Sequence, residues 1–248
     1  MKFVFWWDSP CKGMIGVLRE FCKLAPDTVV LTGGTGKRRE AMGWEPQKAL
    51  FPQHKIIVAP TAKAWESLLH NELQNYLDDF HIVNGLVRPI FRPLLAEILQ
   101  RRLPYATMTE APCNMMNGTK KIVKSILGRV IQPIRHRKFA KTAQAFISLS
   151  GGKAEDLNNI ERLGFPRERI FPFGYFTDQD DSFTYEPVDD GKLHLLCPGL
   201  LEPYKGVDLL VEAIGILPKN DLNKIVCHIT GNGSEKKRLD ARIMVCAQ

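Results

Sequence analysis

The chain has 248 residues, of which 44% are hydrophobic and 25% are charged, and its formal net charge is +7. This composition is typical of a globular protein with one large domain or two small ones, and it excludes a disordered or collagen-like chain. No apolar run approaches the 18 residues that a membrane-spanning helix needs. Because the six cysteines form no CxxC pair and the six histidines form no HExxH motif, we expect small buried thiols, a reducing cytoplasmic compartment and no metal site.

Short β-rich runs alternate with helical stretches over the first 180 residues. In chain order, strands are predicted at 2–7, 28–32, 55–60, 80–85, 105–112, 145–150 and 169–176. Helical periodicity predicts helices at 11–25, 61–77, 93–102, 119–143 and 153–164. Such an alternation favours an α/β fold with a parallel sheet that helices cover on both faces.

A second unit of the same kind begins near the end of the chain. An acidic, turn-rich stretch predicts a linker at 181–191. A strand, a helix and a strand are then expected at 193–199, 207–217 and 224–231. We therefore expect one complete domain over 1–180 and the beginning of another over 192–248.

The second unit carries the pattern with the most chemical information. In GLLEPYKGVDLL, Gly199 follows a strand and Lys205-Gly206 precede an apolar helix, while the next strand ends in Gly231-Asn232-Gly233. Glycine-rich turns at the carboxyl ends of neighbouring parallel strands bind phosphates, because helix N-termini present N–H groups and positive dipole there. A lysine beside them adds a charge that can neutralise a diphosphate.

This segment resembles the retaining family-4 glycosyltransferases, which have the GT-B fold and use nucleotide-sugar donors. The residues that match the family pattern in order are Gly199, Leu201, Lys205, Gly206, Val207, Asp208, Leu209, Leu210, Glu212 and Ala213, followed by Gly231, Gly233, Glu235 and Leu239. The resemblance implies two Rossmann-like domains, an acceptor-binding domain over 1–180 and a nucleotide-sugar-binding domain that begins at 192. It also implies sugar transfer to a saccharide or lipid-linked acceptor in cell-envelope polysaccharide synthesis, without a metal.

The resemblance assigns roles to single residues. Gly199, Lys205, Gly206, Gly231 and Gly233 would bind the donor. Lys205 would also act in catalysis, by stabilising the diphosphate as it leaves.

Two departures from the family pattern bear on activity. Leu200 stands where the family has an arginine that helps to hold the diphosphate. A complete donor domain would also need on the order of 100 more residues, at about 30 per βαβ unit, and the family's paired-glutamate motif is not found. We therefore expect a chain truncated in its donor domain, and the alternative is an inactive fragment that only binds membrane or saccharide.

The first domain would hold the acceptor. Glu110 lies at the end of the fifth strand and Asp8 follows the first, so both should lie at the carboxyl edge of the sheet. Glu110 is the candidate catalytic carboxylate, because it could bind acceptor hydroxyls or stabilise an oxocarbenium-like transition state. Gly174 would lie at the cleft between the domains.

A basic amphipathic stretch at 120–141 predicts a membrane-facing helix. It has an apolar stripe at helical spacing, no acidic residue and eight basic residues: Lys120, Lys121, Lys124, Arg129, Arg135, Arg137, Lys138 and Lys141. Such a helix can lie on an anionic bilayer, although the stripe could equally pack on the sheet while the charges face water. Because the whole excess of positive charge lies in residues 1–188, an anionic partner is expected there, and the lack of a nucleic-acid-binding motif favours a membrane over nucleic acid.

Overall fold

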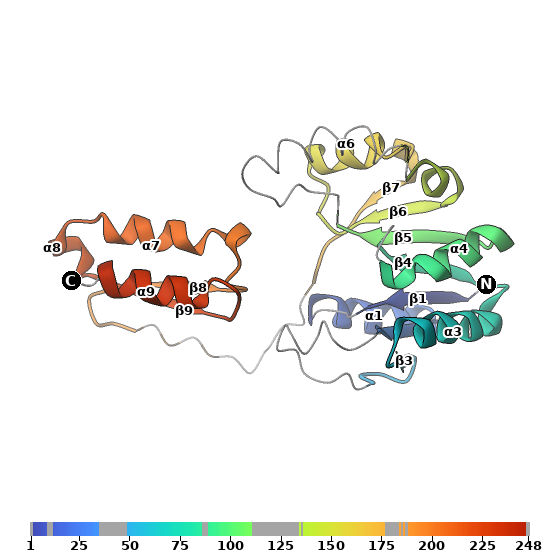
Figure 1. Cartoon of the computed structure of the whole chain (residues 1–248), viewed down its shortest axis with the longest axis horizontal. Helices are drawn as coiled ribbons and strands as arrows, with labels where there is room; N and C mark the ends of the chain where they lie inside the picture. Colours follow the sequence, from blue (N-terminus) through green and yellow to red (C-terminus); the bar gives the residue numbers. More distant parts are fainter. Residues whose placement is uncertain are drawn as a thin grey trace. The chain divides into compact units, whose positions relative to one another are not determined.

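The computed structural model describes residues 2–8, 12–34, 49–85, 89–110, 134, 136–176, 184, 186 and 188–246. These residues form two compact units (Figure 1). Unit 1 lies within residues 2–176 and unit 2 within residues 184–246. Of the predicted linker at 181–191, residues 184, 186 and 188–191 are described.

Unit 1 is built on a parallel sheet, which has seven strands among the described residues, in the order β3-β2-β1-β4-β5-β6-β7. The strands are β1 (Phe3–Trp7), β2 (Val29–Gly34), β3 (His54–Val58), β4 (Phe80–Asn84), β5 (Tyr105–Thr109), β6 (Ala145–Ser148) and β7 (Ile170–Pro172). This is the Rossmann strand order, in which the chain changes direction across the sheet at β1. The predicted α/β, Rossmann-like fold class is confirmed.

Helices cover both faces of this sheet (Figure 1). One face packs against α1 (Lys12–Leu24), and the other packs against α3 (Ala62–Leu73), α4 (Arg92–Arg101), α6 (Ala154–Arg162) and helical residues 136–142. Short 3-10 turns occur at Gln74–Tyr76, Pro89–Phe91 and Arg167–Arg169. Thr61 caps the start of α3, since its hydroxyl accepts a hydrogen bond from the Ala64 N–H at 3.2 Å.

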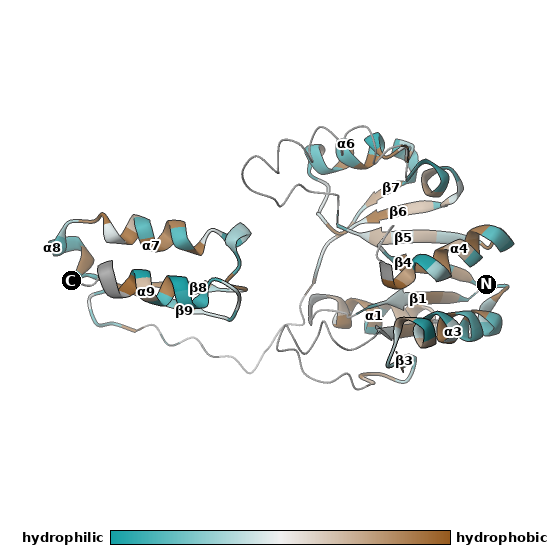
Figure 2. Ribbon diagram, in the orientation of Figure 1, coloured by the Kyte–Doolittle hydropathy of each residue, from teal (hydrophilic) through white to brown (hydrophobic). Residues whose placement is uncertain are grey.

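Strand β1 shows why its sequence is apolar throughout. Val4 and Trp6 are buried beneath α3 and α4, whereas Phe5 and Trp7 are buried on the α1 side. A central parallel strand is covered on both faces, so successive side chains all enter a core. In Figure 2, the helices that cover this sheet carry both hydrophilic and hydrophobic residues, unlike a strand that is buried on both faces.

A buried polar pair lies in the middle of unit 1. The Trp6 indole donates a hydrogen bond to Nδ1 of His81 in β4 at 3.1 Å, and both side chains are fully buried. Burial lowers the pKa of His81 from 6.5 to about 4, although the charge of Asp79 and a backbone contact with Tyr76 favour its protonated form. His81 is therefore neutral in the folded protein near pH 7.

Unit 2 is a βαβα segment with a small core of its own. Its elements are β8 (Leu193–Pro198), a 3-10 turn η4 (Pro203–Lys205), α7 (Val207–Gly215), α8 (Lys219–Leu222), β9 (Ile225–Thr230) and α9 (Lys236–Cys246). Strands β8 and β9 pair in parallel, and Leu201, Val207, Val211 and Leu239 pack together under α7 and α9. Arg242 of α9 forms an ion pair with Glu212 of α7.

The structure differs from the sequence prediction at a few element ends. The fifth strand stops at Thr109, three residues earlier than predicted, so Glu110 follows it directly. No helix is predicted from the sequence where the structure has α9, although Leu239 within it matches the family pattern. Most of the predicted helix at 119–143 lies outside the described residues, which resume within it at 134 and 136–143.

Candidate functional site

The two glycine turns of unit 2 lie against each other at the carboxyl ends of β8 and β9. The Gly199 N–H donates a hydrogen bond to the Thr230 carbonyl at 2.9 Å. Gly231 has φ 144°, and a Cβ on it would lie 1.7 Å from the Gly199 carbonyl oxygen. Only glycine fits there, because both the backbone angle and the missing side chain are needed for this approach.

The two turns also approach each other closely at Gly233 and Leu201. A Cβ on Gly233 would lie 2.3 Å from the Leu201 carbonyl oxygen. Leu201 donates its N–H to the Asn232 carbonyl at 3.0 Å, and its own carbonyl accepts from the Glu235 N–H at 2.9 Å. The structure therefore brings Gly199, Gly231 and Gly233 together, with the buried Leu201 side chain anchoring the turns to the core.

Glu202 ties the turns together through its side chain. Its carboxylate accepts hydrogen bonds from the Ser234 backbone N–H at 3.1 Å and from the Ser234 hydroxyl at 2.8 Å. The backbone hydrogen bond first, and then the hydroxyl, lower the pKa of Glu202. Sequence analysis missed this pair, since no local pattern joins residues 32 positions apart and only the pairing of β8 with β9 brings them together.

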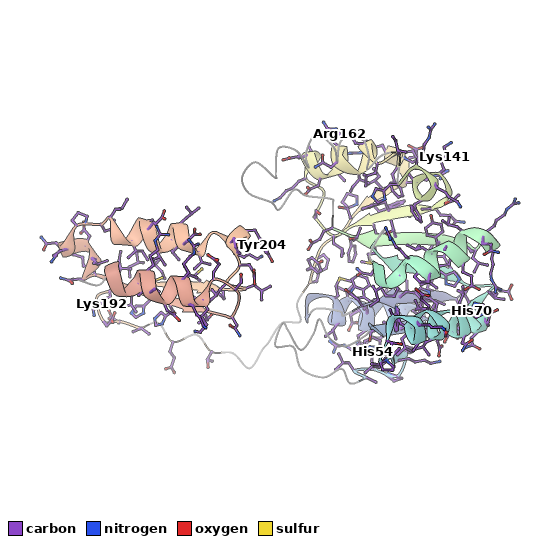
Figure 3. All side chains as sticks on the ribbon, in the orientation of Figure 1. His54, His70, Lys141, Arg162, Lys192 and Tyr204 are labelled. Carbon is purple, nitrogen blue, oxygen red and sulfur yellow. The ribbon has the colours of Figure 1, made fainter. Side chains whose placement is uncertain are left out.

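Lys205 and Gly206 immediately precede the first turn of α7. Gly206 precedes the helix with φ 68° and provides no side-chain cap for its first N–H groups. The exposed Lys205 ammonium lies 5.4 Å from the centre of the Tyr204 ring, and Figure 3 shows Tyr204 at this end of α7. A positive charge and a helix N-terminus together favour an anion at this position.

Arg238 does not replace the arginine that is missing at Leu200. It is paired with Asp208 at 3.1 Å and with Glu235, so two carboxylates already neutralise its charge. The hydrogen bond from Arg238 lowers the pKa of Asp208. Of the residues in these turns, Lys205 is thus the cation predicted to face the diphosphate.

The predicted acceptor residues lie at the carboxyl edge of unit 1. Asp8 follows β1 and Glu110 follows β5, with β4 between these strands, so the two backbone positions are about 10 Å apart at about 4.8 Å per strand. The Tyr175 hydroxyl donates a hydrogen bond to the Glu110 carboxylate at 3.1 Å. The structure therefore adds Tyr175 to the candidate site, a residue that sequence analysis did not single out. Gly174 precedes it in the chain, and its predicted place at a cleft between the domains stays a prediction.

The basic stretch is described only at its end. Lys120, Lys121, Lys124, Arg129 and Arg135 lie outside the described residues. Within helical residues 136–142, the charged side chains of Arg137, Lys138 and Lys141 are exposed, while His136 and Ala140 are buried against unit 1. Figure 3 shows Lys141 and Arg162 of α6 on the same side of unit 1. One face of this helix thus packs on the core while its basic face meets solvent.

The described residues provide neither a membrane-spanning helix nor a metal-binding cluster. In that part of the chain, no helix is long and apolar enough to cross a membrane. No group of three histidine, cysteine or acidic side chains among the described residues could hold a metal ion.

The architecture defines a class of fold. A Rossmann-ordered parallel sheet in unit 1 and a βαβα segment with paired glycine turns in unit 2 place the chain in the Rossmann-like GT-B class. Residues 178–245, which cover most of unit 2, match the family described as Glycosyl transferases group 1. This match includes Arg242 to Val245, which the sequence alone had not related to the family.

Solved structures support this fold assignment. The lipopolysaccharide outer core galactosyltransferase WaaB, in its apo form, is 10% identical, with a TM-score of 0.57 over 100% of this chain and 65% of that one. Alr3699/HepE from Anabaena, in complex with UDP, is 12% identical, with a TM-score of 0.61 over 100% and 66%. The UDP-GlcNAc 2-epimerase from Methanocaldococcus jannaschii is 13% identical, with a TM-score of 0.56 over 99% and 70%.

These likenesses concern the fold. The chain spans less than two thirds of the length of the first two structures. No curated protein sequence matches it. Transferases and an epimerase share the fold, so the fold alone does not assign an activity.

Proposed function

We propose that the chain is a glycosyltransferase that moves a sugar from a nucleotide-sugar donor to a saccharide or lipid-linked acceptor in cell-envelope polysaccharide synthesis. The observation that carries the proposal is Lys205 beside the paired glycine turns, within the segment that matches Glycosyl transferases group 1. The fold likeness to HepE in complex with UDP supports UDP as the nucleotide to test first.

The chemistry follows from where charge develops. The oxygen of an acceptor hydroxyl forms a bond to the anomeric carbon as the bond from that carbon to the diphosphate oxygen breaks, and the hydroxyl proton passes to the leaving diphosphate. Negative charge then grows on the diphosphate, where the Lys205 ammonium and the N-terminus of α7 would stabilise it. We further propose that this charge pairing serves in place of a metal ion. The resemblance to retaining enzymes supports retention at the anomeric carbon, with Glu110 stabilising the oxocarbenium-like transition state.

Replacing Lys205 tests the donor site. Lys205→Ala is expected to weaken UDP binding about tenfold or more, because the variant loses a charge-assisted contact worth about 1.5–3 kcal/mol. The measurement is a calorimetric titration of the full chain with UDP in the presence of EDTA. Lys205→Arg keeps the charge and should recover part of the affinity.

Lys219→Ala is the matched control, since Lys219 is an exposed lysine of the same unit in α8. Equal UDP affinity in the wild type and in Lys205→Ala would contradict the role of Lys205. Absence of any saturable UDP binding in the wild type would instead favour the alternative of a chain that binds membrane or saccharide without transferring sugar.

We also propose that unit 1 docks on an anionic membrane through the exposed basic face of residues 136–142. The triple variant Arg137→Ala, Lys138→Ala and Lys141→Ala should bind vesicles with phosphatidylserine at least tenfold more weakly, at about 1 kcal/mol per charge. Liposome flotation at low and high salt measures this. The comparison variant replaces Lys192, Lys219 and Lys237 of unit 2, which are equally exposed. If both triple variants float like the wild type, this helix does not dock the protein.

A further inference from the structure

The segment that leaves β7 crosses the carboxyl edge of unit 1. We call residues Phe173–Phe176 the strap. Strand β7 is at one edge of the sheet, with β6, β5 and β4 between it and β1. The strap nevertheless reaches α1, which follows β1, because the Phe176 N–H donates a hydrogen bond to the Gly13 carbonyl at 2.9 Å. It therefore passes over the sheet edge where Asp8 and Glu110 lie.

Tyr175 spans part of this edge with its side chain. At one end, its Cβ lies 3.1 Å from the position that a Cβ on Gly13 would take. At the other end, its hydroxyl donates the hydrogen bond of 3.1 Å to Glu110. The ring is fixed between the start of α1 and the end of β5, and the residue is still 44% exposed.

Phe176 presents a second aromatic ring in the same strap. It is 58% exposed, although its backbone is bound to Gly13 and its ring packs edge-on against Phe173 with centroids 5.5 Å apart. The two exposed rings and the Glu110 carboxylate together form a surface with an apolar part and a hydrogen-bond acceptor, which suits a ligand that has both characters.

The chemistry of these groups fits a pyranose ring. A pyranose has a face of C–H bonds, whose partial positive charge is attracted to the negative face of an aromatic ring. Its hydroxyls donate hydrogen bonds to carboxylates, and Tyr175 occupies only one of the roughly four acceptor positions of Glu110. We propose that Tyr175 and Phe176 form an aromatic platform that binds a pyranose ring of the acceptor saccharide, with Glu110 accepting from its hydroxyls.

This inference rests on the proposed function, because it names how that acceptor site recognises its substrate. Its test uses the full chain and the methyl glycosides of D-glucose, D-galactose and N-acetyl-D-glucosamine, observed by saturation-transfer difference NMR. We expect saturation transfer to the ring C–H protons of at least one glycoside. The double variant Tyr175→Ala and Phe176→Ala should reduce this signal at least fivefold.

Two further variants serve as controls. One separates ring stacking on the sugar from the hydrogen bond that holds Tyr175, and the other tests whether losing an exposed ring elsewhere has the same effect. Tyr175→Phe keeps the ring and removes the hydrogen bond to Glu110, so the contact with C–H protons should persist with an affinity lowered two- to fivefold. Phe171→Ala removes a ring that is 51% exposed on β7, outside the strap, and should leave the signal unchanged.

The glycoside experiment tests the aromatic platform, and the UDP titration tests the donor site independently of it. The platform is overturned if the wild-type protein gives no saturation-transfer signal with any glycoside, even when UDP binds normally. It is also overturned if the double variant gives the wild-type signal. Saccharide binding that depends on the strap while UDP fails to bind supports the platform and overturns the donor site. Circular dichroism of each variant excludes unfolding as the cause of a lost signal.

Discussion

Gly231→Ala is expected to abolish UDP binding and to destabilise unit 2 by more than about 3 kcal/mol. The added Cβ would lie 1.7 Å from a backbone oxygen of Gly199, and the residue would keep a φ of 144° that side chains rarely adopt. Backbone strain of this kind costs about 1–3 kcal/mol, and forced overpacking adds about 1–3 kcal/mol. Hydrogen exchange of the amides of β8 and β9 reports on unit 2 separately from unit 1.

The chain offers a control for the backbone angle alone. Gly191 has φ 69°, but a Cβ there would meet nothing within 4 Å. Gly191→Ala should therefore cost only the conformational strain, about 1 kcal/mol, and leave UDP binding intact. If Gly231→Ala showed the same small effect, the close contact between the two turns would not exist in solution.

Acid is expected to weaken unit 1 by about 3 kcal/mol between pH 6.5 and pH 4 through His81 alone. Its pKa is about 4 in the folded protein and 6.5 in the unfolded chain. The unfolded state therefore binds the proton first as the pH falls, and stability is lost from pH 6.5 downward until it levels near pH 4. Burial also lowers the pKa of His136, which adds to the loss in the same direction.

Urea unfolding followed by tryptophan fluorescence at pH 7, 6, 5 and 4 measures this loss. His81→Gln keeps an acceptor for the Trp6 indole but has no titrating ring, so its stability should vary less with pH than that of the wild type. If the free energies of unfolding of the wild type and of His81→Gln fell in parallel as the pH was lowered, groups other than His81 would govern acid unfolding. His70→Gln is the matched control, because His70 is an exposed histidine on α3.

Much of the fold follows from local sequence. The run FVFWW predicts a strand buried on both faces, and Thr61 predicts the start of α3, because each signal depends on a few consecutive residues. The glycines at 199, 231 and 233 could likewise be predicted as paired turns, since parallel strands end at one edge and the family resemblance placed them there. Their roles in donor binding, and that of Lys205, stay predictions.

Contacts between distant residues could not be predicted in this way. The bond between Glu202 and Ser234 depends on the register of β8 with β9, and that between Tyr175 and Glu110 depends on the path of the strap. The ion pairs of Arg238 with Asp208 and Glu235 likewise depend on how α7 and α9 pack, which the local sequence does not indicate.

The central position of β1 has a consequence for synthesis of the chain. β1 is made before the two strands that flank it; it can pair with β2 once residue 34 is available, but its other edge needs β4, which ends at Asn84. Fifty residues take about 3–10 s at about 5–20 residues per second. During that interval the nascent chain carries FVFWW, an apolar strand with one open edge, and α4, which covers it in the folded unit, has not yet been made. Open apolar edges promote pairing between chains, so the order of the strands in the sheet leaves β1 open to such pairing until β4 has been made.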